Sequence, residues 1–231
     1  WYSVSRLDVF PEEFETFLLV SDRIRNAFMR HHSDLFDAEF WQYTQEQIRK
    51  GAVYSTTSTW MFRAGPIVAL ASTVCAGLVL PLASGRAPLG FAGDVFLFAG
   101  FLALGRFFTM AAALDTGSSF EGMGASREAT FSALGEPALL LALSIACVAG
   151  QSVSFAEVFA AIAGPAGDAV RPVLALAALA LFAVLLAENA RIPVDDPNTH
   201  LELTMIHEVM VLDHSGPDFG FVLYGGAMKL F

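Results

Sequence analysis

The chain has 231 residues, of which 55% are hydrophobic, and its mean hydropathy is +0.56. A soluble domain is much less apolar, so the composition excludes an ordinary soluble protein and indicates a polytopic membrane protein. The formal net charge of −10 argues against a nucleic-acid partner.

Residues 1–50 differ in kind from the rest of the chain. They carry a charge every few positions with apolar residues between, which is typical of soluble amphipathic helices. The chain starts with Trp1 and no signal-peptide pattern follows, so we expect a fragment edge or a processed end. Seven of the 13 Lys and Arg residues lie at or before Arg63, which places this side of the chain in the cytoplasm by the positive-inside bias.

The remaining residues, 51–231, predict a membrane domain. Four apolar segments each approach the ~20 residues that a helix needs to cross a hydrocarbon core ~30 Å thick. A fifth segment from Phe219 to Phe231 gives roughly 20 Å of helix, too short to cross, so we expect a truncated span there. The predicted fold class is all-α, a polytopic transmembrane helix bundle. Its full spans are 64–83, 91–114, 129–150 and 172–187.

Two connections between the predicted spans have a composition that suggests a specific structure. Residues 115–128 are rich in Gly and Ser, so they can approach a partner's backbone closely or serve as a plain connector. Residues 151–170 hold a short apolar piece ended by Gly164 and Pro165, which predicts a surface helix rather than a crossing one.

Only two cysteines occur, Cys75 and Cys147, in different predicted spans and without a neighbouring Cys or His. An iron–sulfur cluster needs clustered thiolates. We therefore expect no cofactor in this chain.

Three ionisable residues fall inside predicted spans, where charge is costly and usually functional. Glu136 precedes Pro137, whose missing N–H loosens the helix, so Glu136 is a candidate for a proton path or for a structural tie to another helix. Asp94 and Arg106 lie roughly 18 Å apart along one helix and cannot pair. We expect Asp94 to snorkel toward the membrane edge and Arg106 to find an acidic partner on another helix.

The run from Glu188 to Gly216 concentrates three Glu, three Asp, three His and one Arg directly behind the fourth span. Glu188 and Arg191 are three residues apart and are expected to face each other. Asp196 followed by Pro197 predicts a helix start, and Gly216 predicts its end. This acidic segment, 188–218, is expected to form a cytoplasmic loop and a helix over 197–214.

The predicted helix would have two polar faces. Histidines spaced by seven residues could form a titratable stripe or simply face a partner or lipid headgroups. The motif of a zinc protease is excluded, because Val211 stands where a second histidine would be needed after His207 and Glu208. The opposite face is the better candidate for coupling. The first face carries His200, His207 and His214, and the second carries Glu202 and Asp213.

Four motifs together resemble a known family. The chain is similar to the membrane subunit of group 4 energy-converting nickel-iron hydrogenases, including the formate hydrogenlyase type. That subunit is in turn similar to the quinone-site membrane subunit (subunit 1) of respiratory complex I. The motifs occur in the family's order within residues 50–231: TSTWMFRAGP (57–66), LDTGSSFEGMGASRE (114–128), ALGEPALLLAL (133–143) and ENARIPVDDPNTHLELTMIHEVMVLDHSG (188–216).

The resemblance implies a fragment of the complex I subunit 1 fold, with about eight spans in the full family. It also implies a hydrated path that couples electron transfer to ion movement. The residues expected on this path are Glu136, Glu188, Arg191, Asp195, Glu202 and Asp213, with His200, His207, Glu208, His214 and Arg106 as secondary candidates.

The same resemblance implies that the redox groups, a nickel-iron site and iron–sulfur clusters, belong to partner subunits. Expected partners are hydrogenase large and small subunits, iron–sulfur subunits, antiporter-like membrane subunits and the lipid bilayer of a bacterial or archaeal plasma (inner) membrane. Residues 1–50 match no part of this family. Alternative functions are a complex I subunit at the quinone site and a passive membrane anchor without an ion path.

Overall fold

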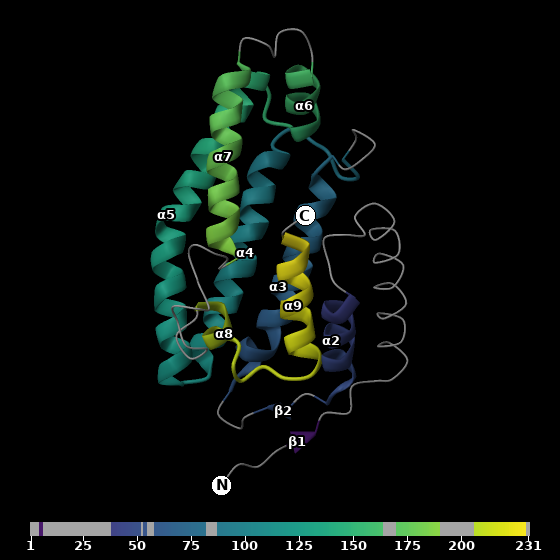
Figure 1. Cartoon of the computed structure of the whole chain (residues 1–231), viewed down its shortest axis with the longest axis vertical. Coiled ribbons are helices and arrows are strands. Elements are labelled where there is room, and N and C mark those ends of the chain that lie inside the picture. The colour runs from purple at the N-terminus through teal and green to yellow at the C-terminus, as the bar shows by residue number, and fades with distance from the viewer. Residues whose placement is uncertain are drawn as a thin grey trace. The chain divides into compact units, whose positions relative to one another are not determined.

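The computed structural model of the chain describes ten helices and strands (Figure 1). The residues fall into two compact units, one drawn from Trp1–Thr56 and His214–Gly220, the other from Thr57–Asp213 and Phe221–Phe231. The described residues are 5–6, 38–51, 53–54, 58–81, 87–163, 170–189 and 206–229.

The first unit contains helix α2 (Ala38–Arg49) and two short strands. Thr44 and Ile48 lie one turn apart on α2 and are buried, as the amphipathic pattern predicts. Gly220 packs on this face, since a Cβ there would lie 2.5 Å from Cγ1 of Ile48. The strands are a small exception to the all-α prediction. They are β1 (Ser5–Arg6) and β2 (Val53–Tyr54), which pair antiparallel.

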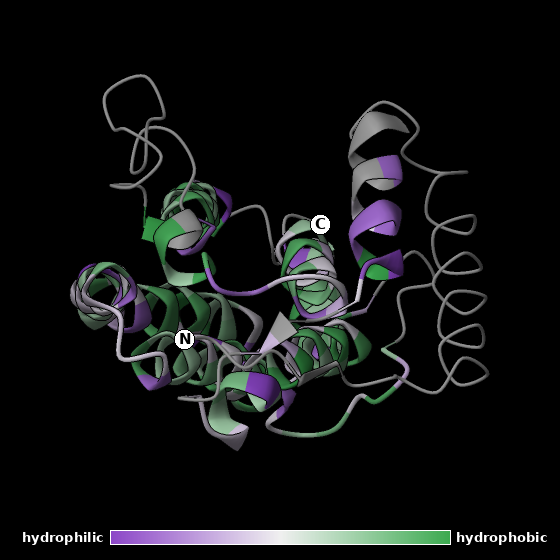
Figure 2. Cartoon of the chain, turned by 90° about the horizontal axis from the view of Figure 1, so that it is seen from below, coloured by the Kyte–Doolittle hydropathy of each residue, from purple (hydrophilic) through white to green (hydrophobic). Residues whose placement is uncertain are grey.

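Among the described residues of the second unit, four helices are long and apolar enough to cross a membrane, in agreement with the four predicted full spans. Green, hydrophobic residues dominate these helices in Figure 2. Long apolar segments form helices in a bilayer because every backbone N–H and C=O must be paired within the segment. The four are α3 (Trp60–Val79), α4 (Asp94–Asp115), α5 (Ser119–Gly150) and α7 (Arg171–Glu188).

Helix α5 begins ten residues earlier than the predicted span at 129–150. The interpretation of 115–128 as a plain connector is therefore wrong from Ser119 onward. One glycine of this segment serves close approach: a Cβ at Gly124 would lie 3.0 Å from Cγ of Met210 and 3.2 Å from the carbonyl oxygen of Ile206. Gly124 thus lets the short helix α8 (Ile206–Met210) pack directly on the backbone of α5.

Helices α3 and α4 pack through small residues. A Cβ at Gly65 would lie 2.6 Å from Cβ of Ala112, and one at Gly105 would lie 2.5 Å from Oγ of Ser72. Small residues let membrane helices approach closely, where dispersion contacts replace the missing hydrophobic effect. Helix α5 in turn contacts α4, α7 and α8, so it is the central element around the ionisable residues.

Asp94 does not snorkel toward the membrane edge, as the sequence suggested. It is fully buried at the start of α4 and accepts hydrogen bonds from the N–H of Phe155 at 2.8 Å and from Oγ of Ser154 at 3.0 Å. These donors begin α6 (Phe155–Ala163), which is too short to cross a membrane, as predicted. The carboxylate therefore satisfies backbone and hydroxyl donors at the α6 N-terminus, which explains its burial.

The helix expected over 197–214 is shorter at its C-terminal end. Helix α8 ends at Met210, residues 211–213 form a turn, and α9 begins at Pro217 and runs to Lys229. The backbone N–H of Asp213 donates to Oε1 of Glu121 at 3.2 Å instead of continuing the helical ladder. Gly216 follows in the left-handed region with φ of 60°. Residues 197–205 lie outside the described residues.

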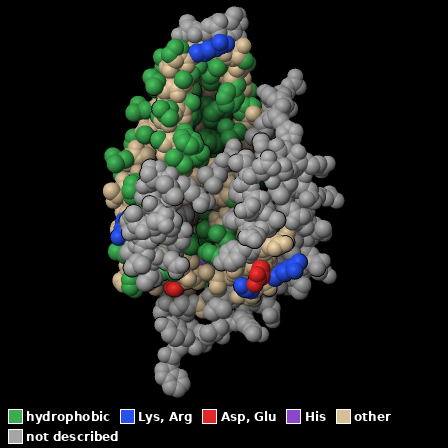
Figure 3. Space-filling model, viewed as in Figure 1, with side chains coloured by type: hydrophobic (Ala, Val, Ile, Leu, Met, Phe, Trp, Pro, Cys, Tyr) green, Lys and Arg blue, Asp and Glu red, His purple; other side chains and the backbone are tan. Residues whose placement is uncertain are grey.

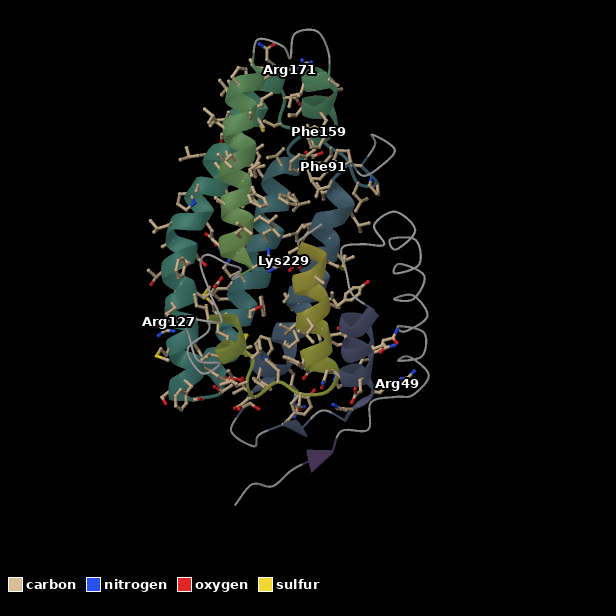
Figure 4. All side chains as sticks on the ribbon, in the orientation of Figure 1. Arg49, Phe91, Arg127, Phe159, Arg171 and Lys229 are labelled. Atoms are coloured by element: carbon tan, nitrogen blue, oxygen red, sulfur yellow. The ribbon has the colours of Figure 1, made fainter. Side chains whose placement is uncertain are left out.

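The outer surface of the spans is apolar. Large hydrophobic side chains are exposed on α5 and α7, among them Leu134, Val148 and Leu176, and green side chains cover this region in Figure 3. Arg127 and Arg171 lie toward opposite ends of these helices (Figure 4). An apolar belt between charged ends is the surface of a multi-pass membrane protein.

Candidate functional site

Arg106 is the centre of the candidate site. It lies on α4, in the interior of a span, and its side chain is only 5% exposed. Three carboxylates from other helices surround it, which confirms the expectation of an acidic partner from another helix. The Nη1 atom donates to Oε1 of Glu136 at 2.9 Å, Nη2 donates to Oε1 of Glu188, and Nε lies 3.5 Å from Oε1 of Glu128.

The three carboxylates differ in their exposure. The side chain of Glu128 is 5% exposed and that of Glu188 is 10% exposed, whereas that of Glu136 is 44% exposed. A guanidinium presents five N–H donors in a rigid fork, so Arg106 can bind several carboxylates at once. The site is therefore closed around Arg106 and opens at Glu136.

Two residues of α5 shape the site locally. Gly135 lies beside Glu188 of α7, and a Cβ there would make an ordinary van der Waals contact, 4.0 Å from Oε1 of Glu188. Pro137 follows Glu136 inside the helix and has no N–H, so the carbonyl of Ala133 lacks its usual helical partner. The helix therefore lacks one backbone hydrogen bond next to Glu136.

Lys229 adds a second cation. It ends the described part of α9 (Figure 4). Lys229 interacts electrostatically with Arg106 and with Glu128. Burying charge in a low-dielectric environment is costly unless each charge is paired. Even with Lys229, the three carboxylates outnumber the two cations. The site can therefore take up a proton on a carboxylate with less electrostatic opposition than a balanced ion pair would give.

Another buried carboxylate lies on the same face of α5, nearer the start of that helix. Glu121 is fully buried and accepts the hydrogen bond from the backbone N–H of Asp213. The side chain of Asp213 is exposed. Glu121 thereby holds the turn after α8 against α5, which is a structural use of a carboxylate.

The sequence interpretation missed Glu121, Glu128 and Lys229. Both glutamates fall within residues 115–128, a segment whose Gly- and Ser-rich sequence does not predict a helix, yet they lie on α5. Their spacing carried the signal: Glu121, Glu128 and Glu136 are seven and eight residues apart, which places them on one face of a continuous helix. Lys229 belonged to a segment that was expected only to be a truncated span.

The predicted path residues have different outcomes. Glu136 and Glu188 are brought together by Arg106, and Asp213 lies beside Glu121 rather than on a helix face. His214 follows the turn after α8, so it does not continue a stripe along that helix, and the proposed stripe is wrong at this position. His207 and Glu208 lie in α8, where side chains are not described. The predicted residues outside the described part are Arg191, Asp195, His200 and Glu202.

The chain is similar to several known proteins. A family model described as NADH dehydrogenase matches residues 44–231, which is most of the chain. The chain belongs to this family. The family assignment confirms the resemblance to the complex I membrane subunit, which the four sequence motifs indicated.

Within this family, two curated relatives from Escherichia coli (strain K12) are similar to the chain. Formate hydrogenlyase subunit 4 is 34% identical over 173 residues, which covers 74% of this chain and 55% of that protein. Hydrogenase-4 component C is 33% identical over 181 residues, which covers 78% of this chain and 56% of that protein. The chain thus spans about half the length of these relatives.

A solved structure shares the fold of this NADH dehydrogenase family member. It is the membrane-bound sulfane sulfur reductase, an archaeal respiratory membrane complex, with a TM-score of 0.67 and 23% sequence identity. The match covers 90% of this chain and 68% of that chain. The likeness confirms the helical membrane fold.

The first 59 residues match another family, whose model is the kinase domain of isocitrate dehydrogenase kinase/phosphatase. Over 51 residues the chain is 63% identical to that enzyme from Aromatoleum aromaticum, which covers 22% of this chain and 9% of the enzyme. The segment that the membrane motifs left unmatched is therefore similar to a small piece of a different protein.

Proposed function

We propose that the chain is an integral membrane subunit of an energy-converting hydrogenase complex, in which it couples electron transfer to translocation of protons or sodium ions. The single observation that carries the proposal is the arrangement of Glu128, Glu136 and Glu188 around Arg106 inside the membrane spans. Ionisable groups at membrane depth usually mark ion pathways.

The site gives a simple way to move a proton. An ionised carboxylate only accepts hydrogen bonds, whereas a protonated carboxyl keeps one acceptor oxygen and gains an O–H donor. Protonating one carboxylate weakens its bond to Arg106, which leaves the guanidinium to bind the others more strongly. Glu136, the exposed member, would exchange protons with the surroundings, and Glu128 and Glu188 would hold them inside.

The peripheral redox module would supply the driving reaction. In the proposed complex, hydrogenase large and small subunits and iron–sulfur subunits dock on the cytoplasmic side, and their nickel-iron site combines two protons with two electrons to form hydrogen. Antiporter-like subunits would carry the ions onward through the plasma membrane. The similarity to hydrogenase and formate hydrogenlyase subunits supports this branch over a quinone-reducing one.

The proposal is tested by Glu136→Gln in the assembled complex, reconstituted in membrane vesicles. Glutamine keeps the shape and a hydrogen bond to Arg106 but cannot hold a proton, so we expect assembly and hydrogen formation with little or no ion translocation. The matched control is Glu157→Gln, which alters an exposed carboxylate on α6 that binds Ser152. Wild-type translocation in the Glu136 variant would reject the ion path and leave a passive anchor.

The branch of the family is tested by the composition of the native complex. A nickel-iron large subunit purified with this chain supports the hydrogenase assignment. Bound quinone, or inhibition by compounds that block quinone sites, would instead assign the chain to a quinone reductase.

A further inference from the structure

Ser132 lies between the two α5 carboxylates of the site. It is four residues after Glu128 and four residues before Glu136, so the three side chains lie on one face of α5 at a rise of about 6 Å per step. Its hydroxyl, together with Arg106, Glu128 and Glu188, lines a small cavity between α4, α5 and α7. The serine is therefore part of the site although the family motifs do not single it out.

The hydroxyl of Ser132 differs from other hydroxyls on α5. Those of Ser126, Thr130 and Ser144 donate to carbonyl oxygens three or four residues earlier in the helix. Serine and threonine commonly bond back to their helix in this way. The Oγ atom of Ser132 is buried, and no residue in the described part of the chain forms a hydrogen bond with it.

A buried polar atom without a partner is costly, so such an atom is usually satisfied by water. The cavity offers the conditions that an ordered water needs, because two carboxylates and a guanidinium line it beside the hydroxyl. A water there can receive a hydrogen bond from Arg106 and donate to Glu128 or Ser132.

Arg106 itself cannot pass protons between the carboxylates. It separates Glu128 from Glu136 and binds both, but a guanidinium has no acceptor lone pair and keeps its charge in proteins. A hydroxyl and a water each donate and accept. A proton that moves from Glu128 to Glu136 therefore has to go around Arg106 through groups of this kind.

We propose that Ser132, with a water held in this cavity, relays protons between Glu128 and Glu136. In one transfer the protonated Glu128 gives its proton to the water, the water gives one to Oγ of Ser132, and the serine gives its own to Glu136. The water and the serine end neutral, Glu128 is ionised and Glu136 is protonated. The relay rests on the proposed function of the site in ion coupling.

The test uses the assembled complex in membrane vesicles and measures the rate of ion translocation together with the rate of hydrogen formation. We expect Ser132→Ala to slow translocation about five- to tenfold, as the loss of one buried hydrogen bond would, and to change the solvent deuterium isotope effect. Ser132→Thr retains the hydroxyl and should recover most of the rate. Ser144→Ala, which removes a hydroxyl bonded to its own helix, should translocate like the wild type.

Several outcomes would overturn the relay. A wild-type rate of translocation in Ser132→Ala would overturn it. A slower rate in Ser132→Ala with an unchanged isotope effect would also overturn it, and so would a Ser132→Thr variant as slow as Ser132→Ala. If Glu136→Gln is uncoupled while Ser132→Ala is normal, only the relay fails; if both are normal, the ion path itself fails. If the complex with Ser132→Ala does not assemble, Ser132→Gly replaces it in the test, because glycine also lacks the hydroxyl. The same criteria then apply to Ser132→Gly.

Discussion

The guanidinium of Arg106 and the carboxylate of Glu128 lie 3.5 Å apart, from Nε to Oε1, and each side chain is only 5% exposed. Two helices, α4 and α5, thus bury opposite charges against each other inside the bundle. Removing one partner of a buried ion pair costs about 3–5 kcal/mol, and Arg106 is the shared partner of all three carboxylates of the site.

The first prediction concerns this pair. Arg106→Gln should reduce assembly of the subunit or lower its stability by roughly 3–5 kcal/mol, because three carboxylates lose their central cation. The double variant Arg106→Gln with Glu128→Gln should recover part of that loss, since one buried negative charge is removed. Complex yield and thermal unfolding in detergent measure both effects. Arg63→Gln, which alters an exposed arginine, is the control.

The second prediction concerns the contact between α3 and α4. Gly65→Ala should lower stability by about 1–3 kcal/mol, because its Cβ would lie 2.6 Å from Cβ of Ala112 and 3.2 Å from the carbonyl oxygen of Phe108. Gly77→Ala on the same helix meets no atom within 4 Å and should be neutral or slightly stabilising. Equal thermal stability of the two variants would contradict close packing at Gly65.

The third prediction concerns the start of α3. Asp115, at the end of α4, accepts hydrogen bonds from the N–H of Thr59 at 2.7 Å and from the N–H of Phe62 at 3.2 Å. Asp115→Ala should therefore cost about 1 kcal/mol, as the loss of a helix cap does. Asp115→Asn keeps an acceptor oxygen without the charge and should lose less. Thermal unfolding of the two variants ranks them, and the reverse order would contradict the capping role.

The fourth prediction concerns pH and His214, whose side chain is 7% exposed. Burial lowers the pKa of His214 from 6.5 to about 4, so the folded form stays neutral where the unfolded form binds a proton. Its contribution to stability is therefore fully present above pH 6.5 and is lost as the pH falls toward 4, by about 3 kcal/mol in total.

Hydrogen exchange over residues 214–220, corrected for the intrinsic effect of pH, measures this loss. In the wild type, protection from hydrogen exchange should decrease as the pH is lowered from about 7 to about 5. His214→Leu cannot titrate and should remove most of the dependence. If His214→Leu shows the same pH dependence of protection as the wild type, a group other than His214 causes it.

The sequence by itself determined the membrane class, the number of spans and the family. Long apolar segments leave a helix as the only structure that pairs every backbone group in a bilayer, so composition alone identified α3, α4, α5 and α7. The need of Arg106 for a carboxylate from another helix also followed from the sequence, because an unpaired charge at that depth is too costly.

Only the tertiary structure decided which carboxylates meet Arg106 and how the polar segments are used. Glu128 belongs to the site because α5 starts at Ser119, so Glu128 lies within this helix. The Gly- and Ser-rich sequence did not predict a helix start at Ser119. Asp94 was buried because the start of α6 offers donors from a segment about 60 residues away. Helix α8 stopped at Met210 because Glu121 takes the N–H of Asp213. Each outcome depends on contacts between residues distant in sequence, which local propensity and periodicity do not contain.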